Sequence, residues 1–266
     1  MQPLDLLPES ALARARGVFA DIDDTITTDG RLTGEAFQAL EALRARALRV
    51  VPITGRPAGW CDHIARMWPV DAVVGENGAF YFAYDRAARR LLKRFRDDEA
   101  TRAASRLRLA AVRDRILIEV PGAALASDQR YRETDLAIDW CEDVPRLGDT
   151  GVDRIVAIMR EAGMTAKVSS IHVNGWLGDY DKLGMTRILV QEQFGVDLDA
   201  DRDRYIFVGD SPNDAPMFAY FPLSVGVANV RRFAARLEHA PAYVTQAESG
   251  AGFAEVAARL LAARRA

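Results

Sequence analysis

The stretch GVFADIDDT, residues 17–25, joins an apolar run to a dense group of acidic side chains. GVFA has the composition of a buried strand, and Asp21, Asp23 and Asp24 follow it directly. Carboxylates usually stay in solvent, because burial disfavours their charged form. Their position after a strand therefore predicts a site in which another group offsets their charge.

The segments around this stretch alternate short β-rich runs with helical patterns. Strands are expected at 17–23, 48–53 and 71–75, with a helix after Thr33 and another after Pro57. A hairpin is expected from AFYFAY and LLKRF. The alternation returns near the C-terminus, with strands expected at 204–209 and 223–228. Helices are expected at 181–194, from SPND onward, at 230–238 and at the C-terminus. This order predicts an α/β fold with a doubly wound, Rossmann-like parallel sheet.

The middle of the chain interrupts that alternation. Its elements predict an inserted α+β cap domain at 86–176, between the two halves of a core domain at 1–85 and 177–266. Within the cap, strands are expected at 115–120, 132–140 and 165–176, and a helix at 149–162.

Composition limits the classes of partner. The chain has 266 residues, 49% of them apolar, and a formal charge of -3, so neither nucleic acid nor an anionic membrane is indicated and a small molecule is the expected partner. No apolar run spans a bilayer and the N-terminus lacks a secretion signal, which favours a cytoplasmic protein. The two cysteines, Cys61 and Cys141, are expected to be buried thiols.

A second acidic group follows another expected strand. In GDSPND, Asp210 and Asp214 come after RYIFV just as Asp21 and Asp23 come after GVFA. Ligands bind at the carboxyl ends of strands in an open parallel sheet, so the two groups are expected to face one crevice. Oxygen ligands without histidine or cysteine indicate Mg²⁺ as the cofactor.

Two further residues extend this pattern. Thr54 follows the strand LRVVPI and offers a hydroxyl, and Lys182 lies near the start of the helix after the insertion and offers a cation. Each feature alone is generic, since turns and surface charges are common. Their order along the chain, each at the end of a strand or helix, is far more specific.

The chain resembles the haloacid dehalogenase superfamily of aspartate-nucleophile phosphotransferases. DIDDT, ITGR, Lys182 and GDSPND correspond to its four motifs. The insertion resembles the type-two cap of sugar-phosphate phosphatases, such as sucrose phosphatase and mannosyl-3-phosphoglycerate phosphatase, and GDSPNDAPMF and RYRET are most similar to the latter.

The resemblance implies a role for each motif residue in hydrolysing a phosphate monoester. Asp21 would be the nucleophile and Asp23 the general acid and base. Asp21, Asp210 and the backbone carbonyl of Asp23 would hold Mg²⁺, with Asp214 binding directly or through water. The phosphate oxygens would be held by Thr54 and Lys182.

The cap offers candidates for substrate recognition. In SSIHVNGW, the alternation of a strand places Ser170, His172, Asn174 and Trp176 on one face and leaves Ile171 and Val173 on the other. His172 and Asn174 would read sugar hydroxyls, or this polar face would simply be exposed to solvent. Arg56 and Asn77, on loops near the carboxyl end of the sheet, are further candidate contacts.

Two other functions share part of this pattern. A phosphomutase would form the same phosphoenzyme but return the phosphoryl group to a sugar. A receiver-type signalling domain combines an acidic pair, a hydroxyl, a lysine and Mg²⁺ on a parallel sheet, and would keep the phosphoryl group as a signal. The length of the insertion and the presence of Asp23 favour the phosphatase.

Overall fold

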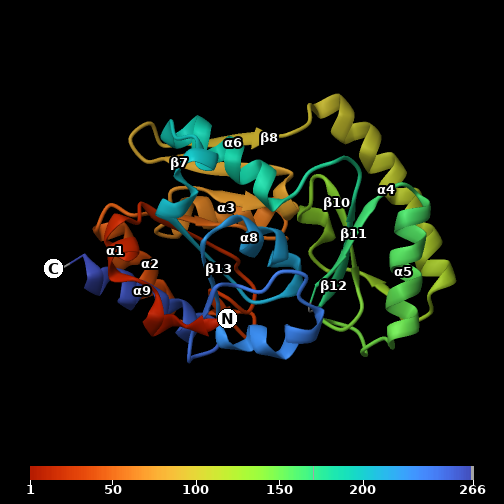
Figure 1. Ribbon diagram of the computed structural model, residues 1–266. Helices are drawn as coiled ribbons and strands as arrows, with labels where there is room; N and C mark the ends of the chain where they lie inside the picture. The colour runs from red at the N-terminus through yellow and green to blue at the C-terminus, as the bar shows by residue number, and fades with distance from the viewer. Residues whose placement is uncertain (170, 265–266) are drawn as a thin grey trace.

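A parallel sheet of six strands forms the centre of the larger part of the computed structural model (Figure 1), which describes residues 1–169 and 171–264. The strand order is β1-β15-β14-β13-β2-β5, and all neighbouring pairs are parallel. The strands are β1 (Gln2–Pro3), β2 (Gly17–Ala20), β5 (Arg49–Pro52), β13 (Tyr205–Gly209), β14 (Leu223–Gly226) and β15 (Tyr243–Val244).

Helices cover both faces of this sheet because its strands are apolar on both sides. Val18 and Val50 point into one apolar cluster, and their chain neighbours Phe19 and Val51 point into the other. The first cluster is closed by α1 (Glu9–Arg14), α2 (Gly34–Ala45), α3 (Ala58–Met67) and α9 (Ser249–Ala263). The second is closed by α6 (Lys182–Phe194), α7 (Leu198–Asp201) and α8 (Ala215–Tyr220). The expected α/β, doubly wound core is therefore confirmed.

A smaller antiparallel sheet extends the core beyond β5. The expected strand at 71–75 and the expected hairpin form β6 (Val73–Gly75), β7 (Phe80–Asp85) and β8 (Arg90–Phe95). A single parallel bridge between Ile53 and Val74 joins this sheet to the main one. A short hairpin, β3 (Thr27–Thr28) and β4 (Arg31–Leu32), follows the acidic stretch.

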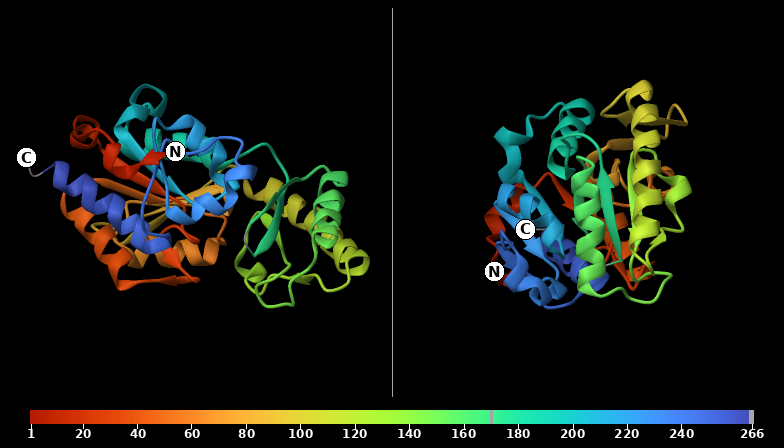
Figure 2. Two further views of the ribbon diagram at one scale, coloured as in Figure 1. Left: turned by 60° about the horizontal axis from the view of Figure 1, so that its bottom comes forward. Right: turned by 90° about the vertical axis from the view of Figure 1, so that its right-hand side faces the viewer.

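A second body of sheet and helices lies beside the core (Figure 2). Its antiparallel sheet has the order β11-β12-β10-β9, and α4 and α5 pack on one face of it around a separate apolar cluster that includes Ile116, Ile138 and Ile155. The elements are α4 (Glu99–Glu119), β9 (Ala124–Leu125), β10 (Asp135–Asp139), α5 (Asp149–Glu161), β11 (Thr165–Val168) and β12 (His172–Trp176).

Two strand predictions for this body are wrong. Residues 115–120 end the helix α4, because Leu109, Val112 and Ile116 recur at helical spacing and pack into the apolar cluster. Residues 165–176 form two paired strands, β11 and β12, instead of one. Ser169 closes the turn between them, since its backbone N donates to the His172 carbonyl and its Oγ accepts from the His172 N.

The predictions for one helix cap, one helix near the C-terminus and the two cysteines are confirmed only in part. Thr33 caps α2 by accepting a hydrogen bond from the backbone N of Ala36, as expected. The helix expected at 230–238 is a 3₁₀ stretch at Ala228–Arg236. Cys61 is buried, but Cys141 is only partly buried because it follows β10 in a surface loop. Within residues 1–169 and 171–264, no helix has the length and hydropathy needed to cross a bilayer.

Candidate active site

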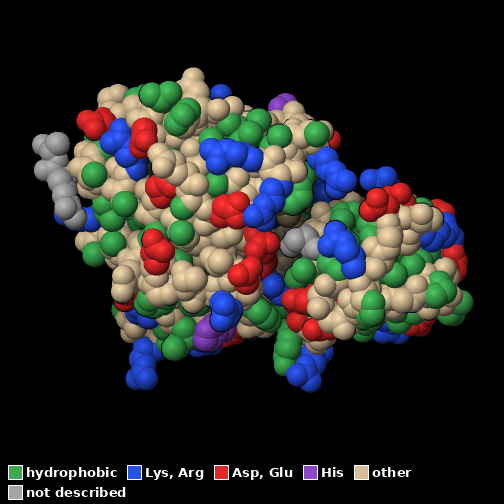
Figure 3. Space-filling view, turned by 90° about the horizontal axis from the view of Figure 1, so that it is seen from below, with side chains coloured by type: hydrophobic (Ala, Val, Ile, Leu, Met, Phe, Trp, Pro, Cys, Tyr) green, Lys and Arg blue, Asp and Glu red, His purple; other side chains and the backbone are tan. Residues whose placement is uncertain are grey.

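A cavity of about 780 Å³ lies where the carboxyl ends of the core strands face β11 and β12. Figure 3 shows acidic side chains on both sides of the boundary between the two bodies. Predicted site residues from both bodies line the cavity: Asp21, Asp23, Arg56, Asn77, His172, Asn174 and Asp210. Thr54, Lys182 and Asp214 are buried next to it. The sheet topology thus gathers residues that are far apart in the sequence.

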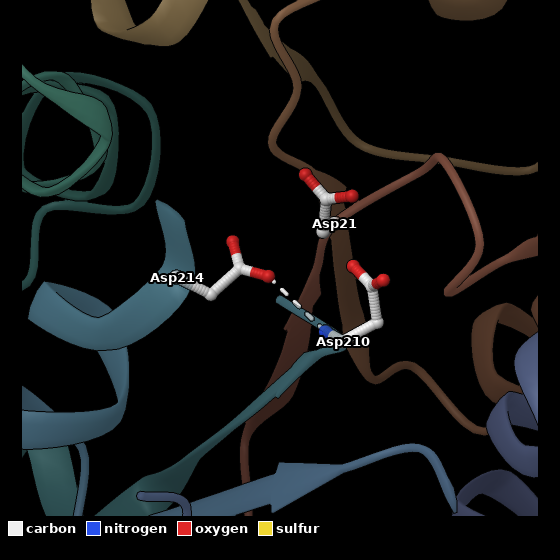
Figure 4. A group of neighbouring side chains, drawn as sticks. All are labelled: Asp21, Asp210 and Asp214. Carbon is white, nitrogen blue, oxygen red and sulfur yellow. Dashed lines mark hydrogen bonds between the residues drawn. The ribbon is translucent and has the colours of Figure 1, made fainter. Parts of the chain in front are cut away.

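Three carboxylates converge at the ends of β2 and β13 (Figure 4). Asp21 follows β2, Asp210 follows β13, and Asp214 lies one turn later at the start of α8. One oxygen from each of the three lies within 4.8 Å of the others, and all three side chains are buried. Asp214 also accepts a hydrogen bond from the backbone N of Asp210, 3.1 Å away, which fixes the turn between them.

Lys182 brings one cation into this cluster. It is the first residue of α6, and its Nζ lies 2.6 Å from Asp21 Oδ1 and 2.8 Å from Asp214 Oδ1. Its side chain is only 6% exposed, so the ammonium depends on these carboxylates for compensation. Lys182 therefore orients Asp21 and Asp214 while leaving the second oxygen of Asp21 to other partners.

The charges of the cluster do not balance. Burial raises the pKa of Asp21 to about 8, and Lys182 opposes that shift. Burial and the neighbouring Asp214 and Asp21 raise the pKa of Asp210 well above its ordinary value. Three buried carboxylates around one ammonium favour a second cation. Their closely spaced oxygen donors suit a hard divalent ion such as Mg²⁺.

Thr54 and Arg56 shape the turn after β5. Thr54 is fully buried and its Oγ1 accepts a hydrogen bond from the Arg56 backbone N at 3.0 Å. The Arg56 guanidinium faces Asp23, with Nε and Nη2 2.9 and 2.8 Å from Asp23 Oδ1. Asp23 is thus paired with Arg56 and is not one of the three carboxylates that converge in the cluster. Sequence reasoning placed Arg56 near the substrate but did not anticipate this pair.

Asn77 lies in a turn that packs against the Thr54 turn. Its backbone N donates to the Thr54 carbonyl at 3.0 Å, and its side chain borders Gly55. The side chain is buried and lines the cavity.

His172 and Asn174 lie on the face of β12 that is turned toward the core. They are 3% and 6% exposed, so the alternative of a solvent-exposed polar face is wrong. Asn174 Nδ2 donates to Asp135 at 3.3 Å, and His172 Nε2 lies 2.8 Å from Glu142 without the alignment of a hydrogen bond. Burial, and then Arg132, lower the pKa of His172, which favours the neutral imidazole.

The structure tests the expected orientation of only some other residues in this segment. Ser170 lies outside the described residues. Ile171, expected to point to the opposite side with Val173, instead lines the cavity, because it lies in the turn before β12. Val173 packs into the apolar cluster under α4 and α5 as expected.

Sequence reasoning missed several polar residues around the cavity. Asn229 donates to Asp210 Oδ2 at 3.3 Å and to the Asp24 carbonyl at 3.0 Å, and so braces the acidic turn. Its place just after β14 was a usable signal, because it too lies at the carboxyl edge of the sheet. Arg132 and Glu142, in the second body, carried no such signal, since nothing in their local sequence distinguishes them from surface charges.

No family model matches the chain. Its sequence is 28% identical over 242 residues to a phosphoglycolate phosphatase of Haloarcula marismortui, an alignment that covers 91% of this chain and 95% of the relative. The match therefore includes both the core and the second body.

Solved structures share the whole architecture. A HAD/COF-like hydrolase of Plasmodium vivax matches with a TM-score of 0.68 and 17% identity, over 96% of this chain and 99% of the other. The sucrose-phosphatase of Synechocystis, solved with sucrose and phosphate, matches with a TM-score of 0.62 and 17% identity, over 92% and 98%. The chain thus has the fold of a HAD/COF-like hydrolase, and its sequence is similar to that of a phosphatase over most of its length.

Proposed function

We propose that the chain is a Mg²⁺-dependent phosphatase that hydrolyses a small phosphate monoester, a sugar phosphate, through a phosphorylated Asp21. The observation that carries this proposal is the position of Asp21, which borders the cavity and lies against Lys182, Asp210 and Asp214. A nucleophilic carboxylate needs such surroundings because the phosphate it attacks is also an anion.

The carboxylates would also hold the metal. Asp21 and Asp210, with the backbone carbonyl of Asp23, would bind Mg²⁺, and Asp214 would bind it directly or through water. When bound, Mg²⁺ would reduce the repulsion between Asp21 and the phosphate. Lys182 already lies against Asp21, and the Thr54 hydroxyl can still donate after accepting from Arg56, so both suit the non-bridging phosphate oxygens.

The chemistry proceeds in two steps. An Asp21 oxygen forms a bond to phosphorus as the bond to the leaving oxygen breaks, and that oxygen takes a proton from Asp23. Asp23 then removes a proton from a water molecule, which attacks the same phosphorus and releases Asp21 and inorganic phosphate. Asp23 suits both steps because it lines the cavity two residues from the nucleophile.

Residues 86–176 would act as a cap over this site. Phosphoryl transfer requires that water be excluded from the first step and admitted to the second, and a lid meets both needs. His172, Asn174, Arg56 and Asn77 would contact the part of the substrate beyond its phosphate, since their side chains line the same cavity.

Two substrate classes merit a direct comparison. A cavity of about 780 Å³ has room for a sugar beyond the phosphate, and its buried amide and imidazole suit hydroxyl groups. The name of the Haloarcula relative suggests phosphoglycolate, whose carboxylate would be met by Arg146 or Lys167 on the cavity wall. We rank sugar phosphates first because two buried, uncharged polar side chains of the cap, His172 and Asn174, line the cavity and can bond hydroxyl groups.

Phosphate release from a panel of monoesters tests the proposal. The panel should hold sugar phosphates, phosphoglycolate and an aryl phosphate, each with Mg²⁺, and the Asp21→Asn variant provides the control. We expect phosphate release by the wild type alone, fastest from a sugar phosphate. Transfer of the phosphoryl group to a second sugar would instead identify a phosphomutase, and a phosphoenzyme stable for minutes would identify a receiver-type domain.

A further inference from the structure

Glu76 is a fully buried carboxylate that the chemistry above does not use. It lies in the turn after β6 and accepts hydrogen bonds from two parts of the chain. Its Oε1 lies 2.9 Å from the backbone N of Ala58, and its Oε2 lies 2.7 Å from the backbone N of Thr134. The backbone N of Glu133, 2.9 Å from Oε1, and the Thr134 hydroxyl complete the set.

These donors belong to different bodies of the molecule. Ala58 is the first residue of α3 in the core, where Pro57 provides no side-chain cap. Glu76 therefore satisfies one of the unpaired N–H groups at the start of that helix. Glu133 and Thr134 directly precede β10, the strand that pairs with β12 and its residues His172 and Asn174. One carboxylate thus contacts the core and the cap at once.

The backbone at Glu76 adopts a strained conformation in the turn that makes this contact. Glu76 and Asn77 both have positive φ values, 41° and 56°, which non-glycine residues adopt only where the surroundings hold them. The Glu76 N donates to the Arg56 carbonyl at 3.1 Å, and the Asn77 N donates to the Thr54 carbonyl at 3.0 Å. The turn is therefore tied directly to Thr54, which is proposed to hold the phosphate, and to its neighbour Arg56.

Arg132 makes a second connection from the same cap segment. Its side chain is 1% exposed, and Nη1 donates to the Gly55 carbonyl and to Asp135, each at 3.0 Å. Asp128 binds the other side of the guanidinium. Residues 132–135 thus reach the Thr54–Arg56 turn both through Arg132 and through Glu76.

We propose that Glu76 is a positioning residue, which couples the placement of the cap to the phosphate-binding turn. By holding Ala58 on one side and Glu133 and Thr134 on the other, it fixes the distance between the Thr54 turn and β12. Substrates that contact both bodies depend on that distance, whereas a small ester held by its phosphate depends on it much less. The kinetic part of this inference rests on the proposed phosphatase function.

Glu76→Gln tests the coupling with little change in shape. In this variant the side-chain NH₂ replaces one carboxylate oxygen and faces groups that are themselves donors, so at least one hydrogen bond is lost. We expect kcat/KM for the best sugar phosphate to fall about 10 to 100-fold, mainly through KM, and that for an aryl phosphate to fall less than about three-fold. Thr134→Val removes only the hydroxyl donor, and its effect should be smaller and not additive with that of Glu76→Gln. Equal losses on both substrates, or additive effects, would overturn the proposal.

Hydrogen exchange provides a readout that needs no activity. In Glu76→Gln, amide exchange should quicken together in peptides around Ala58 and around residues 133–136. Asp139→Asn is the matched control, because Asp139 is 1% exposed and accepts from three backbone N atoms, all within the cap (Cys141, Glu142 and Asp143). It should affect exchange at 141–143 and leave Ala58 unchanged.

The two proposals fail separately. If the wild type releases no phosphate, the phosphatase proposal fails, while paired exchange at Ala58 and 133–136 still supports the coupling. If Glu76→Gln quickens exchange in only one of the two bodies, the coupling is contradicted even in an active phosphatase. Should Glu76→Gln fail to fold, Thr134→Val provides the same exchange test with one bond removed.

Discussion

Arg56 holds the carboxylate of Asp23 through two nitrogens, Nε at 2.9 Å and Nη2 at 2.8 Å from Oδ1. The same guanidinium lies 3.9 Å from Asp128 and 3.8 Å from Glu142, which belong to the second body. It also lies over the ring of Trp60, 4.5 Å from its centroid. Arg56 is therefore placed to hold the proposed acid and base, in addition to its proposed contact with the substrate.

We predict that Arg56→Lys lowers kcat about 10-fold on sugar phosphates and aryl phosphates alike, because Asp23 acts in every turnover and a lysine cannot reproduce the two-nitrogen contact. Steady-state kinetics on both substrates check this. Arg66→Lys is the control, since Arg66 pairs with Asp62 on the surface of α3. A rise in KM for the sugar phosphate alone would assign Arg56 to substrate binding.

Asp23→Asn should separate the two chemical steps. An aryl phosphate has a leaving group that needs no proton, so phosphorylation of Asp21 can proceed, but hydrolysis lacks its base. Rapid mixing should then show a burst of phenol close to one equivalent of enzyme, followed by slow turnover. Steady hydrolysis at the wild-type rate would remove Asp23 from its proposed role.

Metal removal should stop turnover without unfolding the chain. We expect activity to be lost in chelator and restored by Mg²⁺, because the carboxylates of Asp21, Asp210 and Asp214 outnumber the ammonium of Lys182. Ca²⁺ should inhibit, since its larger and more variable coordination shell would misplace Asp21. Circular dichroism in chelator checks that the fold persists. Full activity with Ca²⁺ would contradict a metal role for the cluster.

Substitutions in β12 should change selectivity and leave the chemistry intact. For His172→Ala and Asn174→Ala we expect kcat/KM for the best sugar phosphate to fall about 10 to 1,000-fold, through loss of a buried hydrogen bond to a substrate hydroxyl. An aryl phosphate, which has no hydroxyl to bind, should react within a few-fold of the wild-type rate. Equal losses on both substrates would place the effect in the folding of the cap.

The core could be predicted from sequence because its determinants are local. GVFA, VVP and YIFVG are continuous apolar runs, as expected of strands buried on both faces, and each run leads to polar residues at the sheet edge. The topology alone then gathers Asp21, Thr54 and Asp210. A residue at a strand end thus reveals both its place in the fold and its access to the cavity.

The second body was harder to predict because its determinants are long-range. RILIEV is rich in β-branched residues, yet Ile116 packs toward β10 and α5 while Ile118 remains 80% exposed, a helical pattern that tertiary contacts select. Glu76 and Arg132 are buried between the two bodies, and each has a hydrogen-bond partner in the other body. A charged residue in a turn gives no local sign of such a partner.

The identity of the phosphorylated residue tests the central claim most directly. Asp23→Asn would be mixed with an aryl phosphate and Mg²⁺, quenched, and treated with borohydride, which reduces an acyl phosphate to an alcohol and would convert Asp21 to homoserine. Peptide mass spectrometry would then locate the change. The account predicts homoserine at position 21, lost when Asp21→Asn is added. Phosphate release with position 21 unmodified, or with the label on another residue, would contradict it.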